Sequence, residues 1–146
     1  MTEATTHVLI AEDDDDDYYI FSLAVAETSF KVLVARAENG KILLQLLEKE
    51  IPDIVFLDML MPECDGRDCL KAIRANKRYD SLPIIVYTSL RDLENIEYCY
   101  REGSNLFLIK PDSFTDLRNI LERILAVDWK KTMYYPPRSE FVLKAS

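Results

Sequence analysis

Three short, almost continuously apolar segments constrain the fold of this chain more than any other feature. They are VLIA at residues 8–11, IVFL at residues 54–57 and IIVY at residues 84–87. Segments of this length match strands, and unbroken apolar strands are typical of a parallel sheet that is covered on both faces. Together with two similar runs they define five predicted strands, at residues 8–11, 31–35, 53–57, 83–87 and 106–109.

Between the predicted strands, apolar residues recur at helical spacing. The clearest examples run from Ile42 to Leu47 and from Leu117 to Leu125. Residues that favour helix ends fit this pattern, namely Asn39, Asp65 and Ser113 before helices and Gly103 after the fourth helix. Five alternations of strand and helix predict a doubly wound α/β fold with right-handed crossovers.

The chain length fits one domain, which we assign to residues 1–129. The chain has 146 residues, of which 49% are hydrophobic and 30% charged, as in globular proteins. Apolar periodicity stops at Trp129, and Pro136 and Pro137 exclude a continued helix. Residues 130–146 are therefore predicted to be an extended tail without a fold of its own, apolar enough to pack on the domain or on a partner.

Charge and composition also limit the partners and the location. The net charge is -8, and Lys and Arg do not cluster, which argues against a nucleic-acid surface. No leader-like start and no apolar run of membrane-spanning length is present, so we expect a cytoplasmic protein without membrane contact. Cys64, Cys69 and Cys99 lack the spacing of a zinc site or a disulfide framework and are predicted to be reduced thiols, with a redox role disfavoured.

Polar side chains follow four of the five predicted strands. Ligands collect at the carboxyl ends of strands in open parallel sheets. These ends carry Glu12 and Asp13, then Asp58, then Thr88 and Ser89, and last Lys110. Three converging acids repel one another unless a cation intervenes, and a site made of oxygen ligands favours Mg²⁺ over zinc. Asp14 to Asp17 are instead interpreted as a solvated helix start.

The same residues fit phosphoryl transfer to an aspartate. A carboxylate can attack phosphorus and form an aspartyl phosphate. Such a transfer depends mainly on placement and on neutralising the phosphoryl oxygens. A lysine at position 110 and a hydroxyl at position 88 supply a point charge and a hydrogen bond for that purpose.

Four segments together resemble the receiver domain of bacterial two-component response regulators. They are VLIAEDD, IVFLDMLMPECDG, IIVYTS and LFLIKP, in the order and at the spacing of that family, over about residues 7–127. The resemblance implies a flavodoxin-like (βα)5 fold with a five-stranded parallel sheet in the order 2-1-3-4-5. It also implies a stand-alone receiver similar to those of chemotaxis.

The resemblance further implies a role for each site residue. Asp58 is the expected phosphoacceptor, and Lys110 and Thr88 are expected to contact the phosphoryl group. The expected ligands of Mg²⁺, or of Mn²⁺, are Glu12, Asp13, Asp58 and the backbone carbonyl of Leu60. Phe107 matches the aromatic switch residue, which is expected to turn from an outer to an inner position when Thr88 moves toward the phosphoryl group.

The implied partners are proteins. The phosphoryl donor would be a sensor histidine kinase or a phosphotransfer protein, and an unidentified downstream protein would read the surface of the fourth helix, fifth strand and fifth helix. The chain is not expected to be an enzyme beyond catalysing its own phosphorylation and dephosphorylation. Because Leu60 and Leu90 are aliphatic and cannot orient a water, we expect slow dephosphorylation.

Two other functions are compatible with these motifs. One is a phosphorylation-independent interaction module with the receiver fold, although all the polar site positions are present. The other is a phosphatase of the haloacid dehalogenase type, which also uses a nucleophilic aspartate and Mg²⁺. That class has a second acid two residues after the nucleophile, where this chain has Leu60.

Overall fold

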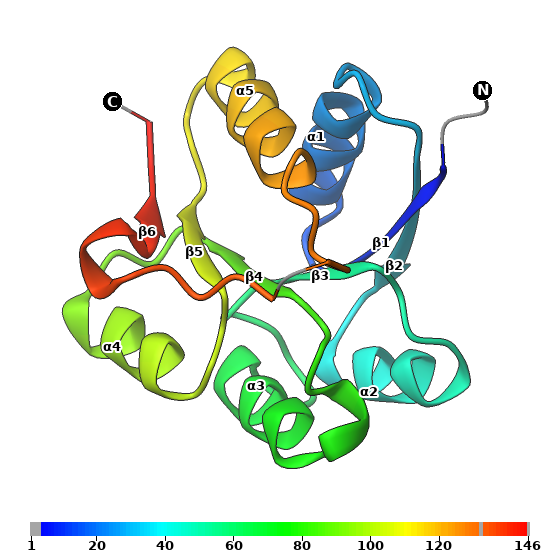
Figure 1. Cartoon of the computed structure of the whole chain (residues 1–146). Coiled ribbons are helices and arrows are strands. Elements are labelled where there is room, and N and C mark those ends of the chain that lie inside the picture. The colour runs from blue at the N-terminus through cyan, green and yellow to red at the C-terminus, as the bar shows by residue number, and fades with distance from the viewer. Residues whose placement is uncertain (1–3, 132, 146) are drawn as a thin grey trace.

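A single parallel sheet with helices on both faces forms the centre of the molecule (Figure 1). The computed structural model describes residues 4–131 and 133–145. The strands are β1 (Thr6–Ala11), β2 (Val32–Ala37), β3 (Ile54–Leu57), β4 (Ile84–Thr88), β5 (Leu106–Ile109) and β6 (Val142–Leu143), arranged in the order β2-β1-β3-β4-β5-β6. The flavodoxin-like α/β fold and the order 2-1-3-4-5 are confirmed, and β6 is a sixth strand that the apolar pattern of the sequence does not predict.

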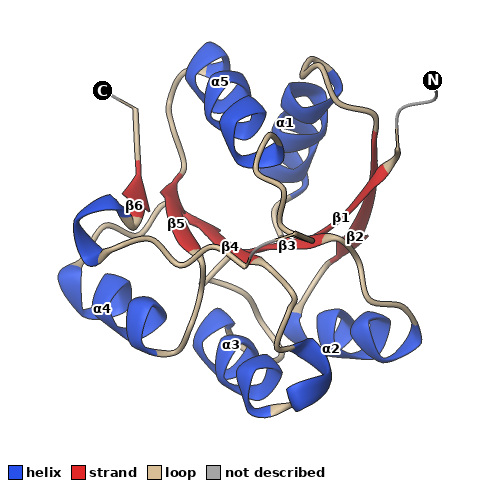
Figure 2. Cartoon of the chain, in the orientation of Figure 1, coloured by secondary structure: helices blue, strands red, loops and turns tan. Residues whose placement is uncertain are grey.

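The helices divide between the two faces of the sheet (Figure 2). Helices α1 (Asp15–Ala26) and α5 (Phe114–Leu125) cover one face, and α2 (Gly40–Lys49), α3 (Gly66–Ala75) and α4 (Leu93–Arg101) cover the other. The predicted caps are confirmed, because the side chains of Asn39, Asp65 and Ser113 each accept a hydrogen bond from a first-turn N–H. Gly103 follows α4 with a φ of 91°, a left-handed conformation that glycine adopts without strain.

Successive residues of the central strands serve the two opposite cores. On β1, Val8 and Ile10 pack with the side chains of α1 and α5, whereas Leu9 and Ala11 pack with those of α2 and α3. All the residues of β3, β4 and β5 are buried. Burial on both faces explains why these strands read as continuous apolar runs, and their parallel pairing brings their carboxyl ends to one edge of the sheet.

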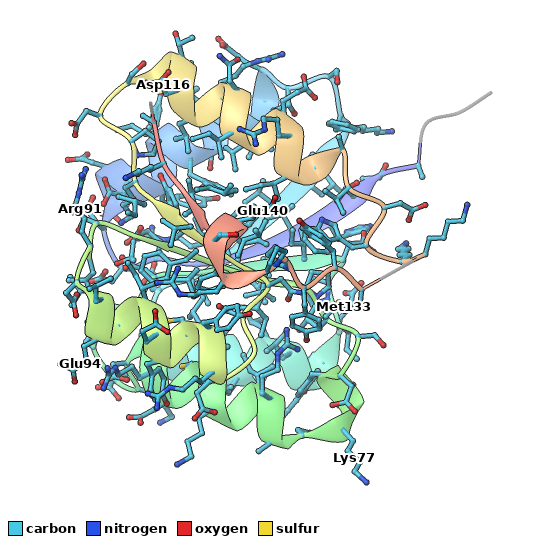
Figure 3. The ribbon with its side chains drawn as sticks, turned by 60° about the vertical axis from the view of Figure 1, so that its left-hand side comes forward. Lys77, Arg91, Glu94, Asp116, Met133 and Glu140 are labelled. Carbon is cyan, nitrogen blue, oxygen red and sulfur yellow. The ribbon has the colours of Figure 1, made fainter. Side chains whose placement is uncertain are left out.

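The C-terminal segment, residues 133–145, packs on the domain itself. Strand β6 pairs with β5, and a 3-10 turn at Arg138–Glu140 precedes it across the sheet edge, where Glu140 is labelled in Figure 3. The ring of Phe141 is fully buried, with its centroid 5.1 Å from that of Tyr100 and 6.2 Å from that of Phe107. This segment therefore adds a short strand to the sheet of the domain. Residues 1–3, Thr132 and Ser146, which belong to the predicted domain and tail, lie outside the described residues.

Candidate functional site

Glu12 and Asp13 lie at the carboxyl end of β1, as their position after an apolar strand predicts. The N–H of Glu12 donates to the carbonyl of Ala37 at 3.0 Å, which continues the pairing of β1 with β2. Arg36 fixes the same residue from the side, because its Nε donates to the Glu12 carbonyl at 3.0 Å. The side chain of Glu12 is buried, whereas Asp13 is exposed, so the pair reaches from the interior to solvent.

Asp58 lies beside this pair at the end of β3. Its N–H donates to the carbonyl of Ala11 at 3.0 Å, and its Oδ1 accepts the N–H of Leu60 at 3.2 Å. Carboxylate oxygens of Glu12, Asp13 and Asp58 lie within 4.8 Å of one another. The structure therefore brings the three predicted acids together at one edge of the sheet.

Lys110 extends from the end of β5 into the acidic cluster. Its Nζ lies 2.6 Å from Oε1 of Glu12 and 3.2 Å from Oδ2 of Asp58. Burial lowers the pKa of Lys110, but its hydrogen bonds to Asp17 and Glu12 outweigh that effect and raise the pKa above the ordinary value. The ammonium is therefore charged at neutral pH and offsets part of the negative charge of the cluster.

Burial acts on Glu12 in the opposite direction. The pKa of Glu12 is raised to about 7, chiefly because its side chain is removed from water and also because Asp58 lies nearby, while the hydrogen bond from Lys110 offsets part of this rise. An added cation at the cluster would favour the ionised form of Glu12.

The other predicted site residues lie at neighbouring strand ends. Thr88 is fully buried, its hydroxyl accepts the N–H of Leu90 at 3.4 Å, and its carbonyl accepts the N–H of Lys110 at 2.8 Å. Leu60 points its side chain outward, with 54% exposed, and the predicted role of its carbonyl stays a prediction.

Phe107 lies in β5, and its side chain is fully buried. The C-terminal segment contributes to this environment, because β6 pairs with β5 and the ring centroid of Phe141 lies 6.2 Å from that of Phe107. A role for Phe107 in switching remains a prediction.

Asp17 also belongs to the cluster, although its place in a run of acids predicts a solvated helix start. Its Oδ2 lies 2.8 Å from Nζ of Lys110. It precedes the buried Phe21 by four residues, so both lie on the face of α1 that meets the sheet. That spacing is a signal that could have identified Asp17.

The loop between β3 and α3 is fixed from beneath. Met59 and Met61 are buried on either side of the exposed Leu60. Gly66, at the start of α3, approaches the backbone of Asp58 and Met59 so closely that a β-carbon would collide with it. These contacts hold the backbone that carries Asp58 against the end of the sheet.

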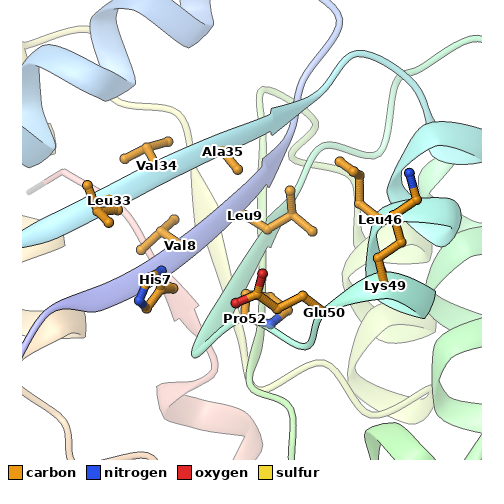
Figure 4. Close-up of a pocket in the computed structure, with 10 residues that line it drawn as sticks. All are labelled: His7, Val8, Leu9, Leu33, Val34, Ala35, Leu46, Lys49, Glu50 and Pro52. Atoms are coloured by element: carbon orange, nitrogen blue, oxygen red, sulfur yellow. The ribbon is translucent and has the colours of Figure 1, made fainter.

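An apolar pocket of about 300 Å³ lies at the opposite end of β1 (Figure 4). Residues of β1 and β2, including His7 and Leu33, line one side, and Leu46 and Lys49 of α2 line the other. His7 is at the start of β1, at the opposite end of the strand from Glu12. This pocket contains none of the acids of the site.

Comparison with known proteins identifies the family. The model of the response regulator receiver domain matches residues 8–122. The chain belongs to the response regulator receiver family. The rice (Oryza sativa subsp. japonica) two-component response regulator ORR5 is 30% identical over 121 residues, covering 82% of this chain and 88% of that protein.

Solved receiver structures have the same fold. The Mn²⁺-bound form of response regulator Rcp1 has a TM-score of 0.76 and 21% identity, covering 90% of this chain and 99% of that one. Vibrio cholerae chemotaxis protein CheY4 has a TM-score of 0.71 and 25% identity, covering 83% of this chain and 99% of that one. Within residues 4–131 and 133–145, helices long and apolar enough to span a bilayer are absent from this receiver.

Proposed function

We propose that this receiver accepts one phosphoryl group on Asp58 and signals through the resulting change in shape. The supporting observation is the placement of Lys110, whose Nζ contacts both Glu12 and Asp58 within a cluster of three carboxylates. A nucleophilic carboxylate, a cation for the phosphoryl oxygens and a set of metal-binding oxygens are thus at one sheet edge. Phosphoryl transfer to an acid needs these groups.

In the proposed reaction an oxygen of Asp58 attacks the phosphorus of a phosphohistidine. The P–O bond forms as the P–N bond breaks, and the electron pair leaves with the imidazole of the donor. Lys110 neutralises one phosphoryl oxygen, and the hydroxyl of Thr88 donates a hydrogen bond to another after leaving its contact with Leu90. The chain catalyses only its own phosphorylation and dephosphorylation.

The residues of the cluster fit a hard divalent cation. Their donors are all oxygens, two of the acids are buried, and the exposed Asp13 leaves room for water ligands. We propose Mg²⁺, or Mn²⁺ in its place, held by Glu12, Asp13, Asp58 and the carbonyl of Leu60. Bound there, the ion supplies charge that stabilises the transferred phosphoryl group.

The proposed donor is a sensor histidine kinase or phosphotransfer protein, and the proposed location is the cytoplasm. The output is a changed surface of α4, β5 and α5, read by a downstream protein. Support comes from the backbone hydrogen bond in which the N–H of Lys110 donates to the carbonyl of Thr88. It joins the ends of β4 and β5 at the site. Added negative charge at Asp58 would attract the hydroxyl of Thr88 and the ammonium of Lys110, and so act on the ends of both strands.

Acetyl phosphate and Mg²⁺ provide the test. Intact-mass analysis should show one acid-labile phosphoryl group on the wild type and none on Asp58→Asn. Asp16→Asn is the matched control, because Asp16 lies in α1 with its side chain exposed and should not alter incorporation. No incorporation would favour an interaction module, and continuous turnover of a phosphate ester would favour a phosphatase. Either result would refute the proposal.

A further inference from the structure

Two cysteine thiols lie in contact in the segment that follows the proposed phosphorylation site along the chain. Cys64 is in the loop between β3 and α3, and Cys69 is in the first half of α3, five residues later. Their Sγ atoms are 3.1 Å apart, and Cys69 Sγ also lies 3.6 Å from the carbonyl oxygen of Cys64. We call Cys64 and Cys69 the thiol pair.

The backbone around the thiol pair is held in an unusual conformation. Glu63 has a φ of 65° and Cys64 a φ of 103°, in the left-handed region that residues with a side chain rarely adopt. Helix α2 closes the pair from the other side, because a β-carbon on Gly40 would collide with the Cys64 carbonyl and with Cys69 Sγ. The two sulfur atoms are thus held close together by the loop and by the packing of α2 against it.

From this geometry we infer that the thiol pair is a redox site, in which a small peroxide converts Cys64 and Cys69 into a disulfide that slows phosphoryl acceptance at Asp58. A disulfide needs an S–S distance of about 2.05 Å. The sulfurs must therefore approach by about 1 Å, which a local adjustment of the loop can supply. The regulatory part of this inference rests on the proposed function, whereas the disulfide itself does not.

The reaction balances with peroxide as the oxidant. Cys64 is half-buried and accessible, so its sulfur attacks one peroxide oxygen, the O–O bond breaks, and a sulfenic acid and water form. Cys69 then attacks the Cys64 sulfur, the S–O bond breaks, and a second water leaves. The two sulfurs lose two electrons in total, and these reduce hydrogen peroxide to two waters.

Charge near the thiol pair favours a neutral oxidant. Burial raises the pKa of Cys69 above its usual range, and Cys64 and the nearby Asp65 and Asp68 raise it further. The same acids repel an anionic disulfide such as oxidised glutathione, whereas hydrogen peroxide carries no charge. Because Cys69 reacts as its thiolate, disulfide formation should become faster as pH rises.

The disulfide would act on Asp58 through the intervening loop. Leu60 donates its N–H to Asp58 Oδ1 at 3.2 Å, and the same loop continues to Cys64. Moving the loop by about 1 Å displaces that donor, and a misplacement of this size can slow a reaction strongly. We expect the disulfide form to accept a phosphoryl group about tenfold more slowly.

Peptide mapping tests the disulfide without reference to phosphorylation. The reduced protein is treated with hydrogen peroxide, its free thiols are alkylated, and it is digested with trypsin. Arg67 lies between the two cysteines, so trypsin separates them unless a disulfide joins the peptides. We expect joined peptides that dithiothreitol separates, with Cys99 alkylated after unfolding. Unjoined peptides, or a disulfide to Cys99 or to a second molecule, would overturn the inference.

The regulatory effect needs a second measurement. Incorporation from acetyl phosphate is compared before and after peroxide in the wild type, Cys64→Ser and Cys99→Ala. We expect peroxide to slow phosphoryl incorporation in the wild type and in Cys99→Ala, but not in Cys64→Ser. Equal rates of incorporation in the oxidised and reduced wild type would overturn the regulatory effect. If no form incorporates phosphate, the proposed function fails, and the peptide map still decides whether the disulfide forms.

Discussion

Replacing Phe141 with alanine tests whether the C-terminal segment is an integral part of the domain. The ring is fully buried between Tyr100 and Phe107, and truncation of a buried phenylalanine costs about 3–5 kcal/mol. The loss of stability cannot exceed the free energy of all the contacts that hold the segment on the domain. Besides the ring of Phe141, these contacts are the pairing of β6 with β5 and a partly exposed ion pair between Arg138 and Glu97, which contributes about 0–1 kcal/mol.

We therefore expect Phe141→Ala to lower the free energy of unfolding by about 3 kcal/mol, measured by urea denaturation at neutral pH. If the segment detaches, the dependence of that free energy on urea falls as well, because less surface is buried in the native state. Tyr135→Ala is the control, since its side chain is 51% exposed and its loss should change stability by less than about 0.5 kcal/mol. A loss below about 1 kcal/mol for Phe141→Ala would refute the reasoning.

Three further results are expected. Arg74→Lys should cost about 2–3 kcal/mol in urea, because the guanidinium donates to the carbonyls of Gly103, Tyr79 and Leu82 and a lysine cannot reach them all. Without a divalent cation, the free energy of unfolding should fall by about 3 kcal/mol between pH 4.5 and 8, because the pKa of Glu12 is about 7 in the folded protein and 4.5 ordinarily. Glu12→Gln should remove this dependence on pH. Leu60→Asn and Leu90→Glu should shorten the life of the phosphorylated protein, and unchanged decay would exclude a role for these positions.

The fold could be predicted from the sequence because the apolar runs of the strands and the caps of the helices are both local patterns. Unbroken apolar runs reflect strands buried on two faces, and caps such as Asn39 satisfy the N–H groups of their own helix. Strand β6 left no such signal. It has only two residues, both partly buried, and the preceding Phe141 packs against Tyr100 of α4 and Phe107 of β5, which are distant in sequence.

The site was predictable to the same extent. Glu12, Asp13, Asp58 and Lys110 directly follow strands, so a parallel sheet must bring them to one edge. Asp17 differs because its position depends on which face of α1 meets the sheet, and a run of consecutive acids hides that spacing. The buried position of Phe107 also depends on a distant segment and could not be read from β5 alone.

The C-terminal segment changes how the proposed output surface can be used. Strand β6 occupies the free edge of β5, and Phe141 fills the space between α4 and the sheet, so a partner that pairs with this edge must first displace the segment. If displacement costs about 3 kcal/mol, it weakens such a partner by about two powers of ten. Any rearrangement at Thr88 that moved Phe107 would weaken the contact with Phe141 and reduce that cost. The buried pair Phe107 and Phe141 would then connect the site to the free edge of β5. A partner that binds this edge should therefore bind Phe141→Ala more tightly than the wild type.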